Sequence, residues 1–284
     1  MHRKRALRRR RTLAAVVLVA VAVAAGFAAK RLSHLGGVDE RGARVSTLEI
    51  QSRAVGEKLA TTVVVPSALS GAERPPLLVF LHGRGGENGS EASNAFYAAL
   101  DGLGSRAPVV AMPDGGEDSY WHDRADGRWA RYVVREVIPR VAGRFGTDPR
   151  RVAIGGISMG GFGAFDIARL HHGRFCAVGG HSPALWRSGG ETAPGAFDDA
   201  EDFARHDVVG TARSAPEAFA GSALWIDAGD ADPFRPGIDA FTAALRAGGV
   251  PISAHSWPGG HDGDYWNEHW RAYARFYARA LASC

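Results

Sequence analysis

The chain has 284 residues, of which 45% are hydrophobic and 23% charged, a globular composition that excludes a disordered, collagen-like or disulfide-framework chain. Its formal net charge is +4, but residues 1–31 contain nine Lys/Arg and no acidic residue, so 34 − 9 leaves 25 basic against 30 acidic side chains in the remainder. A phosphate-binding surface needs basic residues clustered on the folded domain. We therefore expect no nucleic-acid partner.

Residues 1–31 have the pattern of an export signal or an amino-terminal membrane anchor. Seven cations precede an uncharged run from Thr12 to Ala29 that is rich in Ala, Val and Leu, and Lys30 and Arg31 follow it. A run of about 18 residues lies at the low edge of the length that spans a bilayer. The positive-inside rule then places the rest of the chain outside the cytoplasm, either anchored to the membrane or, if the segment is cleaved, secreted.

Residues 32–44 are predicted to form a linker, and residues 45–284 a domain in which strand and helix patterns alternate. Strands are expected at 45–50, 59–65, 77–81, 109–112, 152–154, 175–178, 224–226 and 252–257, the first two forming an antiparallel pair. Helices are expected at about 91–102, 129–145, 159–171, 235–247 and 264–282. This order predicts an α/β fold with a mostly parallel central sheet covered by helices on both faces. Residues 183–221 break the rhythm and are predicted to be an excursion over the carboxyl edge of the sheet.

The candidate nucleophile is a serine at the end of a predicted strand. Gly156-Ile157-Ser158-Met159-Gly160 matches G-x-S-x-G, and the pattern gains weight because an apolar strand precedes it and an apolar helix follows. A serine on such a tight turn is raised above the sheet. The amide end of the following helix favours negative charge that develops there. We predict that Ser158 is the nucleophile.

A glycine-rich loop follows the strand at 77–81. Its sequence, His82-Gly83-Arg84-Gly85-Gly86, is of the H-G-x-G-G type, which supplies an amide donor to an oxyanion. We expect the backbone N–H groups of Arg84 and Met159 to form the oxyanion hole, and His82 to hold the loop. A phosphate-binding loop is disfavoured because no Lys-Ser/Thr pair follows the glycines.

The general base should be a histidine after a late strand. His261 follows the strand at 252–257 and the segment Pro258-Gly259-Gly260, directly before the final helix. That glycine-flanked position suits a base that must reach Ser158. His181, after the strand at 175–178, is the alternative, but this strand follows the nucleophile closely.

The orienting acid should lie between the serine and the histidine. Asp227 falls within a strand pattern, and Asp230 and Asp232 follow it. Asp232 fits the G-x-x-D spacing from Gly229, which turns a carboxylate toward the histidine loop, and Asp230 is the alternative. The resulting chain order of serine, aspartate and histidine is that of α/β-hydrolases.

From about Val45 to Leu281 the chain resembles the putative-esterase branch of the α/β-hydrolase superfamily. That branch includes esterase D, feruloyl and acetyl-xylan esterases, enterochelin esterases and the mycolyltransferases. The matching segments are Ser52–Gly56, Leu81–Gly83, Met112–Gly115, Gly155–Gly161, Gly229-x-x-Asp232 and Gly260-His261. The resemblance implies the α/β-hydrolase fold and the same nucleophile, acid, base and oxyanion donors. The mycolyltransferase acyl-groove segments have no match, and the basic amino terminus contradicts a cytosolic S-formylglutathione hydrolase.

The aromatic run Tyr120-Trp121-His122, together with Trp186 and Trp266, is a candidate for lining an acyl or sugar pocket, although tryptophans at helix and loop edges more often serve packing. Asp262 and Asp264 beside His261 lack the further ligands of a metal site, and no cofactor motif is present, so we expect neither metal nor cofactor.

The two cysteines are Cys176, in an apolar strand pattern, and Cys284, the final residue of the sequence. We do not expect a disulfide between them, because terminal residues seldom reach a central strand.

These features predict an extracytoplasmic serine esterase that hydrolyses a small-molecule or polysaccharide-linked ester through an acyl-enzyme intermediate. An acyltransferase of the mycolyltransferase type is one alternative, and a catalytically silent envelope binding module on the same fold is another. The sequence leaves open the acyl and alcohol groups, the cleavage of residues 1–31 and the oligomeric state.

Overall fold

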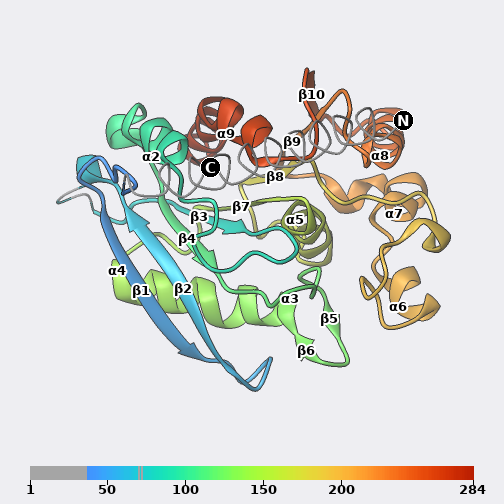
Figure 1. Cartoon of the computed structure of the whole chain (residues 1–284), viewed down its shortest axis with the longest axis horizontal. Helices are drawn as coiled ribbons and strands as arrows, with labels where there is room; N and C mark the ends of the chain where they lie inside the picture. The colour runs from blue at the N-terminus through green and yellow to red at the C-terminus, as the bar shows by residue number, and fades with distance from the viewer. Residues whose placement is uncertain (1–36, 70, 72) are drawn as a thin grey trace, which may run out of the picture. The chain divides into compact units, whose positions relative to one another are not determined.

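Eight strands form the central sheet within residues 37–69, 71 and 73–284, which are the residues described by the computed structural model (Figure 1). Their order across the sheet is β1-β2-β4-β3-β7-β8-β9-β10. β1 pairs antiparallel with β2 and β2 with β4, and every later neighbour pair is parallel. The strands are β1 (Arg44–Gln51), β2 (Lys58–Val65), β3 (Leu77–Leu81), β4 (Val109–Pro113), β7 (Val152–Ile157), β8 (Ala177–His181), β9 (Ala223–Gly229) and β10 (Ser253–Trp257). The mostly parallel sheet predicted from the sequence is confirmed.

The helices follow the strands in the predicted order. They are α2 (Asn94–Asp101), α3 (Trp129–Tyr132), α4 (Ile138–Phe145), α5 (Met159–Leu170), α6 (Ala200–Arg205), α7 (Val208–Ser214), α8 (Arg235–Ala247) and α9 (Gly263–Ala282). The helix predicted at 129–145 is interrupted by a π-helical turn at Val133–Val137, and a short hairpin, β5 (Asp123–Arg124) with β6 (Gly127–Arg128), precedes it. The strand predicted at 175–178 lies later, at 177–181, so His181 belongs to the strand.

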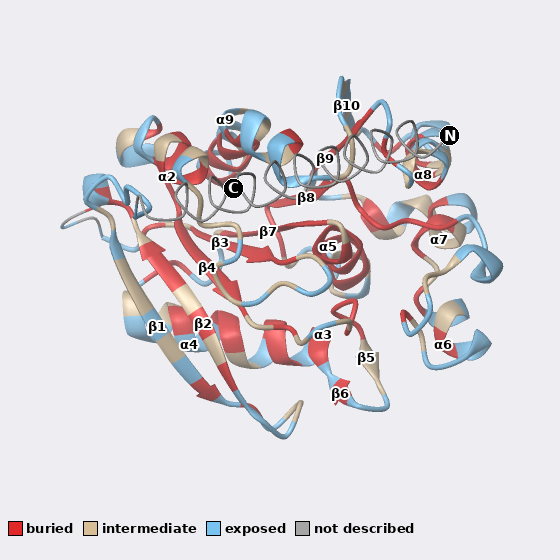
Figure 2. Ribbon diagram, in the orientation of Figure 1, coloured by how far each residue is buried: buried red, intermediate tan, exposed pale blue. Residues whose placement is uncertain are grey.

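Helices cover both faces of the sheet, because the apolar side chains along its central strands point alternately into two cores (Figure 2). In β3, Leu77, Val79 and Leu81 pack into one core with α5, while Leu78 and Phe80 pack into the other with α2 and α9. All five residues of β3 are buried, which is the pattern of a strand covered on both faces. The layers leave the carboxyl ends of the parallel strands open, where a ligand site is expected.

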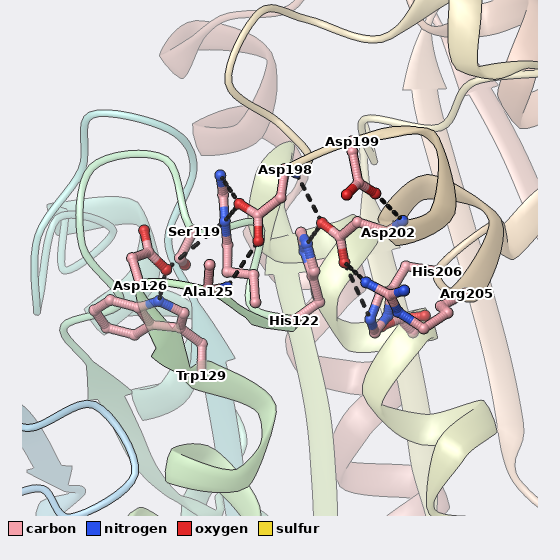
Figure 3. Close-up of polar contacts among 12 residues, drawn as sticks. Ser119, His122, Ala125, Asp126, Trp129, Asp198, Asp199, Asp202, Arg205 and His206 are labelled. Atoms are coloured by element: carbon pink, nitrogen blue, oxygen red, sulfur yellow. Dashed lines mark hydrogen bonds and ion pairs between the residues drawn. The ribbon is translucent and has the colours of Figure 1, made fainter.

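The excursion at 183–221, which contains α6 and α7, is attached to the segment at 119–128 by charged groups (Figure 3). Asp198 accepts hydrogen bonds from Nε of Arg124 (3.0 Å) and from the amide of Ala125 (2.7 Å). Asp202 Oδ2 lies 3.0 Å from Nε2 of His122, and both side chains are fully buried. Burial lowers the pKa of His122. The excursion is therefore held against the segment at 119–128, and each contributes a residue, Ala193 and Tyr120, to the pocket described below.

A disulfide joins Cys176 to Cys284, so the expectation that the two cysteines remain apart is wrong. The helix α9 has 20 residues, about 30 Å of length, and it packs along β7, β8 and β9. The guanidinium of Arg151 donates two hydrogen bonds to the carbonyl of Leu281 and anchors the end of this helix. Cys284 is thereby brought to the residue that precedes β8, with the two Cα atoms 5.7 Å apart.

No helix among the described residues is long and apolar enough to cross a bilayer. The apolar segment at 12–29, predicted to be an export signal or anchor, lies outside the described residues.

Candidate active site

Ser158 occupies the turn between β7 and α5 in a backbone conformation that residues other than glycine rarely adopt. Its φ is 53° and its ψ is −113°. Three backbone hydrogen bonds hold it there: its N–H donates to the carbonyl of His181, and its carbonyl accepts from Phe162 and Ala184, each at 3.0 Å. A Cβ at Gly160 would lie 2.0 Å from the carbonyl oxygen of Leu81, so this turn requires a glycine at that position. Strain held by surrounding contacts is common at functional sites.

Ser158, His261 and Asp232 form one chain of hydrogen bonds. The Ser158 hydroxyl donates to Nε2 of His261 at 2.9 Å, and Nδ1–H of His261 donates to Oδ2 of Asp232, also at 2.9 Å. Asp232 is 4% exposed, whereas the His261 side chain is 21% exposed. The histidine can therefore meet a bound molecule while the carboxylate stays behind it.

The two candidate acids after β9 have different partners. Oδ1 of Asp232 accepts from the amide of Phe234 (2.8 Å), which leaves Oδ2 directed at the histidine. Asp230 instead accepts from the amide of Gly259 (3.0 Å) and so braces the loop before His261. His181, the alternative base, is buried in β8, where its ring contacts Asp227 and Tyr277.

The loop after β3 is held by His82. Its Nδ1–H donates to the carbonyl of Gly83 (2.8 Å), and its Nε2 accepts from the amide of Gly115 (2.9 Å). Burial lowers the pKa of His82, and the neutral ring provides the one donor and one acceptor that these contacts need. A Cβ built on Gly83 would lie 3.5 Å from Cβ of Ser158. The loop that carries Arg84 therefore lies directly beside the serine.

A pocket of about 700 Å³ opens above Ser158 and His261. Its wall includes Gly83–Gly86 on the loop after β3; Ser90, Glu91 and Ser93 before α2; Trp266, Asn267 and Trp270 on α9; and three residues from separate segments, Tyr120, Ala193 of the excursion and Phe234 before α8. The rings of Phe234 and Trp266 lie 5.0 and 5.2 Å from that of His261. Aromatic rings thus line the pocket next to the histidine.

Of the three tryptophans considered as pocket residues, only Trp266 is in the wall of this pocket. Trp121 is fully buried, and its Nε1–H donates to the carbonyl of His82 (3.1 Å), so it supports the glycine-rich loop. Trp186 packs behind the wall against Tyr120 and Phe234. Tyr120, which belongs to the aromatic run considered from the sequence, does lie in the wall, whereas Phe234 was missed.

Glu91 is a carboxyl in the pocket wall with an unusual environment. Burial raises its pKa to about 7, and hydrogen bonds from the amides of Glu91 and Gly83 only partly oppose that rise. Its Oε2 atom is buried without a hydrogen-bond partner. Within the part of the chain that the structure describes, no group of three or more His, Cys, Asp or Glu side chains converges as in a metal site.

Comparison with known proteins identifies the family of the chain. The family model described as Putative esterase matches residues 52–274. Esterase Rv1288 of Mycobacterium tuberculosis (strain ATCC 25618 / H37Rv) is 25% identical over 265 residues, covering 78% of this chain and 57% of the relative. The chain therefore spans a little over half the length of that relative.

Two further similarities concern other members of the superfamily. Diacylglycerol acyltransferase/mycolyltransferase Ag85A of Mycobacterium ulcerans is 25% identical over 258 residues, covering 80% of this chain and 74% of the relative. The solved structure of a ferulic acid esterase superposes on this chain with a TM-score of 0.75 at 24% sequence identity. The superposition covers 84% of this chain and 98% of that one, so the two share the α/β-hydrolase fold. The family model covers most of the chain, so the chain belongs to the Putative esterase family.

Proposed function

We propose that the chain is an extracytoplasmic serine esterase that hydrolyses carboxylic esters through an acyl-enzyme intermediate, with Ser158, His261 and Asp232 as nucleophile, base and orienting acid. The observation that carries the proposal is the continuous pair of 2.9 Å hydrogen bonds through the three side chains at the floor of an open pocket. A silent binding module would not require this alignment.

In the acylation step, Oγ of Ser158 attacks the ester carbonyl while Nε2 of His261 removes its proton. The imidazolium returns that proton to the leaving alcohol, and Asp232 stabilises its positive charge. A water molecule then attacks the acyl-enzyme by the same route, which releases the acid and restores Ser158.

The negative charge on the tetrahedral intermediate requires donors beside the serine. We assign them to the amides of Met159, the first residue of α5, and Arg84. The donor at Met159 is fixed because the turn at Ser158 is fixed, and the one at Arg84 because His82 and Trp121 hold the loop. Removing one preorganised donor from an oxyanion hole costs about 2.7–4 kcal/mol of transition-state stabilisation.

A fluorophosphonate probe and a short-chain p-nitrophenyl ester test the proposal. Ser158→Ala should lose covalent labelling and retain at most a few per cent of the esterase activity, with little change in Tm, because no core cavity is opened. Ser188→Ala, on an exposed loop outside the pocket, is the matched control and should behave as wild type. Substantial activity or labelling in Ser158→Ala would assign the chemistry to another residue.

The mycolyltransferase relatives favour acyl transfer as a second candidate. An acyltransferase uses the same acyl-enzyme but passes the acyl group to an alcohol instead of water. Adding glycerol or a disaccharide to the ester assay separates the two reactions. Ester product that exceeds free acid at millimolar alcohol identifies a transferase, whereas free acid as the main product identifies a hydrolase.

Two observations support the proposed location outside the cytoplasm. The basic, apolar pattern of residues 1–31 is typical of export, and the disulfide between Cys176 and Cys284 suits an oxidising compartment. Fractionation of the native cells tests the location. The full chain should be found with the membranes or outside the cell, and a variant lacking residues 1–31 should be soluble and active. Full-length protein in the cytosol would refute the location.

A further inference from the structure

Asp227 is a buried carboxylate that the proposed mechanism does not use. It lies in β9 and is fully buried. Its Oδ1 accepts from Nε1 of Trp225 and from Nδ1 of His181, both at 2.7 Å. Its Oδ2 accepts from the hydroxyls of Tyr273 (2.8 Å) and Tyr265 (3.0 Å). Four donors from three elements thus meet at one carboxylate, which links β8 and β9 to α9.

Tyr265 connects this carboxylate to the loop that carries His261. It lies in the first turn of α9, where its amide donates to Oδ1 of the N-cap residue Asp262 (3.0 Å). Its ring lies against Gly259, whose φ is +141°. A Cβ built on Gly259 would lie 2.8 Å from Cδ2 of Tyr265. Tyr265 therefore contacts the loop on both sides of His261.

The rest of the loop shows why this contact matters. Its first half is fixed by the hydrogen bond from Gly259 to Asp230 and by the one from the amide of Ala231 to the carbonyl of Gly259 (both 3.0 Å). Its second half runs directly into α9, which begins at Gly263, two residues after His261. The position of the imidazole thus depends on where the first turn of α9 lies.

We propose that Tyr265, through its hydrogen bond to Asp227, is a positioning residue that holds His261 in line with Ser158; this rests on the serine esterase function proposed above. Burial, together with the nearby Asp227 carboxylate, raises the pKa of Tyr265, so its hydroxyl keeps the proton that it donates. The same strand, β9, leads into the loop of Asp232, so the acid and the base are fixed to one rigid element.

Two tyrosine variants separate positioning from stability. Tyr265→Phe and Tyr273→Phe each remove one hydroxyl that donates to the same Oδ2 from a buried residue of the same helix, but Tyr273 lies two turns further from the loop. Displacing a catalytic group by about 1 Å can cost about 10²-fold. We expect Tyr265→Phe to lower kcat on a p-nitrophenyl ester roughly tenfold with KM changed less than twofold.

The rate constant of fluorophosphonate labelling should fall by the same factor, since His261 must activate Ser158 in that reaction as well. Tyr273→Phe should show a similar fall in Tm but a change in kcat below about threefold. Equal kcat losses in the two variants, or no loss in Tyr265→Phe, would overturn the positioning role. Wild-type protein that neither hydrolyses esters nor reacts with the probe would instead refute the proposed function itself.

A double variant tests whether Tyr265 acts through Asp227. Asp227→Asn keeps the shape and one acceptor oxygen but weakens the hydrogen bond, and it should reproduce the loss in kcat. Adding Tyr265→Phe to Asp227→Asn should then cause less than a twofold further loss, because both changes break the same link. Losses that multiply would show that the two residues act separately and would refute the proposed route.

Discussion

Removal of the disulfide between Cys176 and Cys284 should destabilise the domain substantially. The bond joins residues separated by 108 positions in the sequence. In the chain-entropy description, closing a loop of this size lowers the entropy of the unfolded ensemble by about 16 cal/mol/K, which corresponds to about 4.8 kcal/mol at 25 °C. The perturbation is the double variant Cys176→Ser/Cys284→Ser, which leaves no free thiol.

The expected change in Tm follows from the size of the compact unit that contains both cysteines, residues 40–284. At about 2.1 cal/mol/K per residue, its unfolding entropy is about 510 cal/mol/K, so about 4.8 kcal/mol corresponds to a Tm lower by about 9 °C. Esterase activity at 25 °C should hardly change, because Cys176 lies at the start of β8 and Ser158 beyond the opposite ends of the parallel strands.

Scanning calorimetry of the wild type, with and without a reductant, and of the double variant measures this effect. The reduced wild type should match the variant, and the oxidised wild type should melt higher than both. A Tm difference below about 2 °C would refute the reasoning, since the low end of the typical disulfide contribution, about 2 kcal/mol, corresponds to about 4 °C here.

Two further outcomes follow from the site. Asp232→Asn should lower turnover by roughly 10²–10⁴-fold and Asp230→Asn by less than about tenfold, because only Asp232 accepts a hydrogen bond from the ring of His261. Both variants are assayed on the same ester at pH 8, and a larger loss in Asp230→Asn would reverse the assignment. The pKa of Glu91 rises to about 7 on folding. Between the ordinary pKa of a glutamate and pH 7, Glu91 is therefore protonated more often in the folded than in the unfolded state, so it lowers the free energy of unfolding as the pH rises. The stability gained in Glu91→Gln should therefore grow from pH 4.5 to 7 and then level off in urea unfolding; a gain independent of pH would contradict this.

The sheet and the residues at its edge were predictable because local patterns determine them. A buried parallel strand is a short apolar run, and the carboxyl ends of such strands meet at one edge. Reactive side chains just after these runs were thus expected to converge, and the structure places Ser158, Asp232 and His261 within hydrogen-bond reach although 103 residues separate the first from the last.

Features that depend on the path of a whole element were not predictable in this way. The disulfide requires that α9 extend far enough along β7 to β9 to bring Cys284 to the start of β8, and no local pattern states that direction. The orientation of Trp121 away from the pocket depends on the left-handed backbone at Tyr120 and Trp121, with φ of 50° and 61°, in a loop without a glycine at those positions. Residues with a Cβ give no warning of such a conformation.

Strand β9 and the loop that follows it carry two carboxylates, Asp227 and Asp232, that each hold a histidine, which shows why residue types alone do not identify a catalytic site. Asp227 binds Nδ1 of His181 at 2.7 Å, and Asp232 binds Nδ1 of His261 at 2.9 Å. The two histidines differ in the partner of Nε2. For His181 the partner is the hydroxyl of the fully buried Tyr277, whereas for His261 it is the Ser158 hydroxyl, which lies at a pocket. A phenol sealed in the core can only stabilise, whereas a serine that meets solvent can attack. The buried pair of Asp227 and His181 therefore holds together the strands β8 and β9, and Asp232 follows the second of them. The same aspartate–histidine pairing stabilises the structure within β9 and, in our proposal, supports catalysis in the loop beyond it.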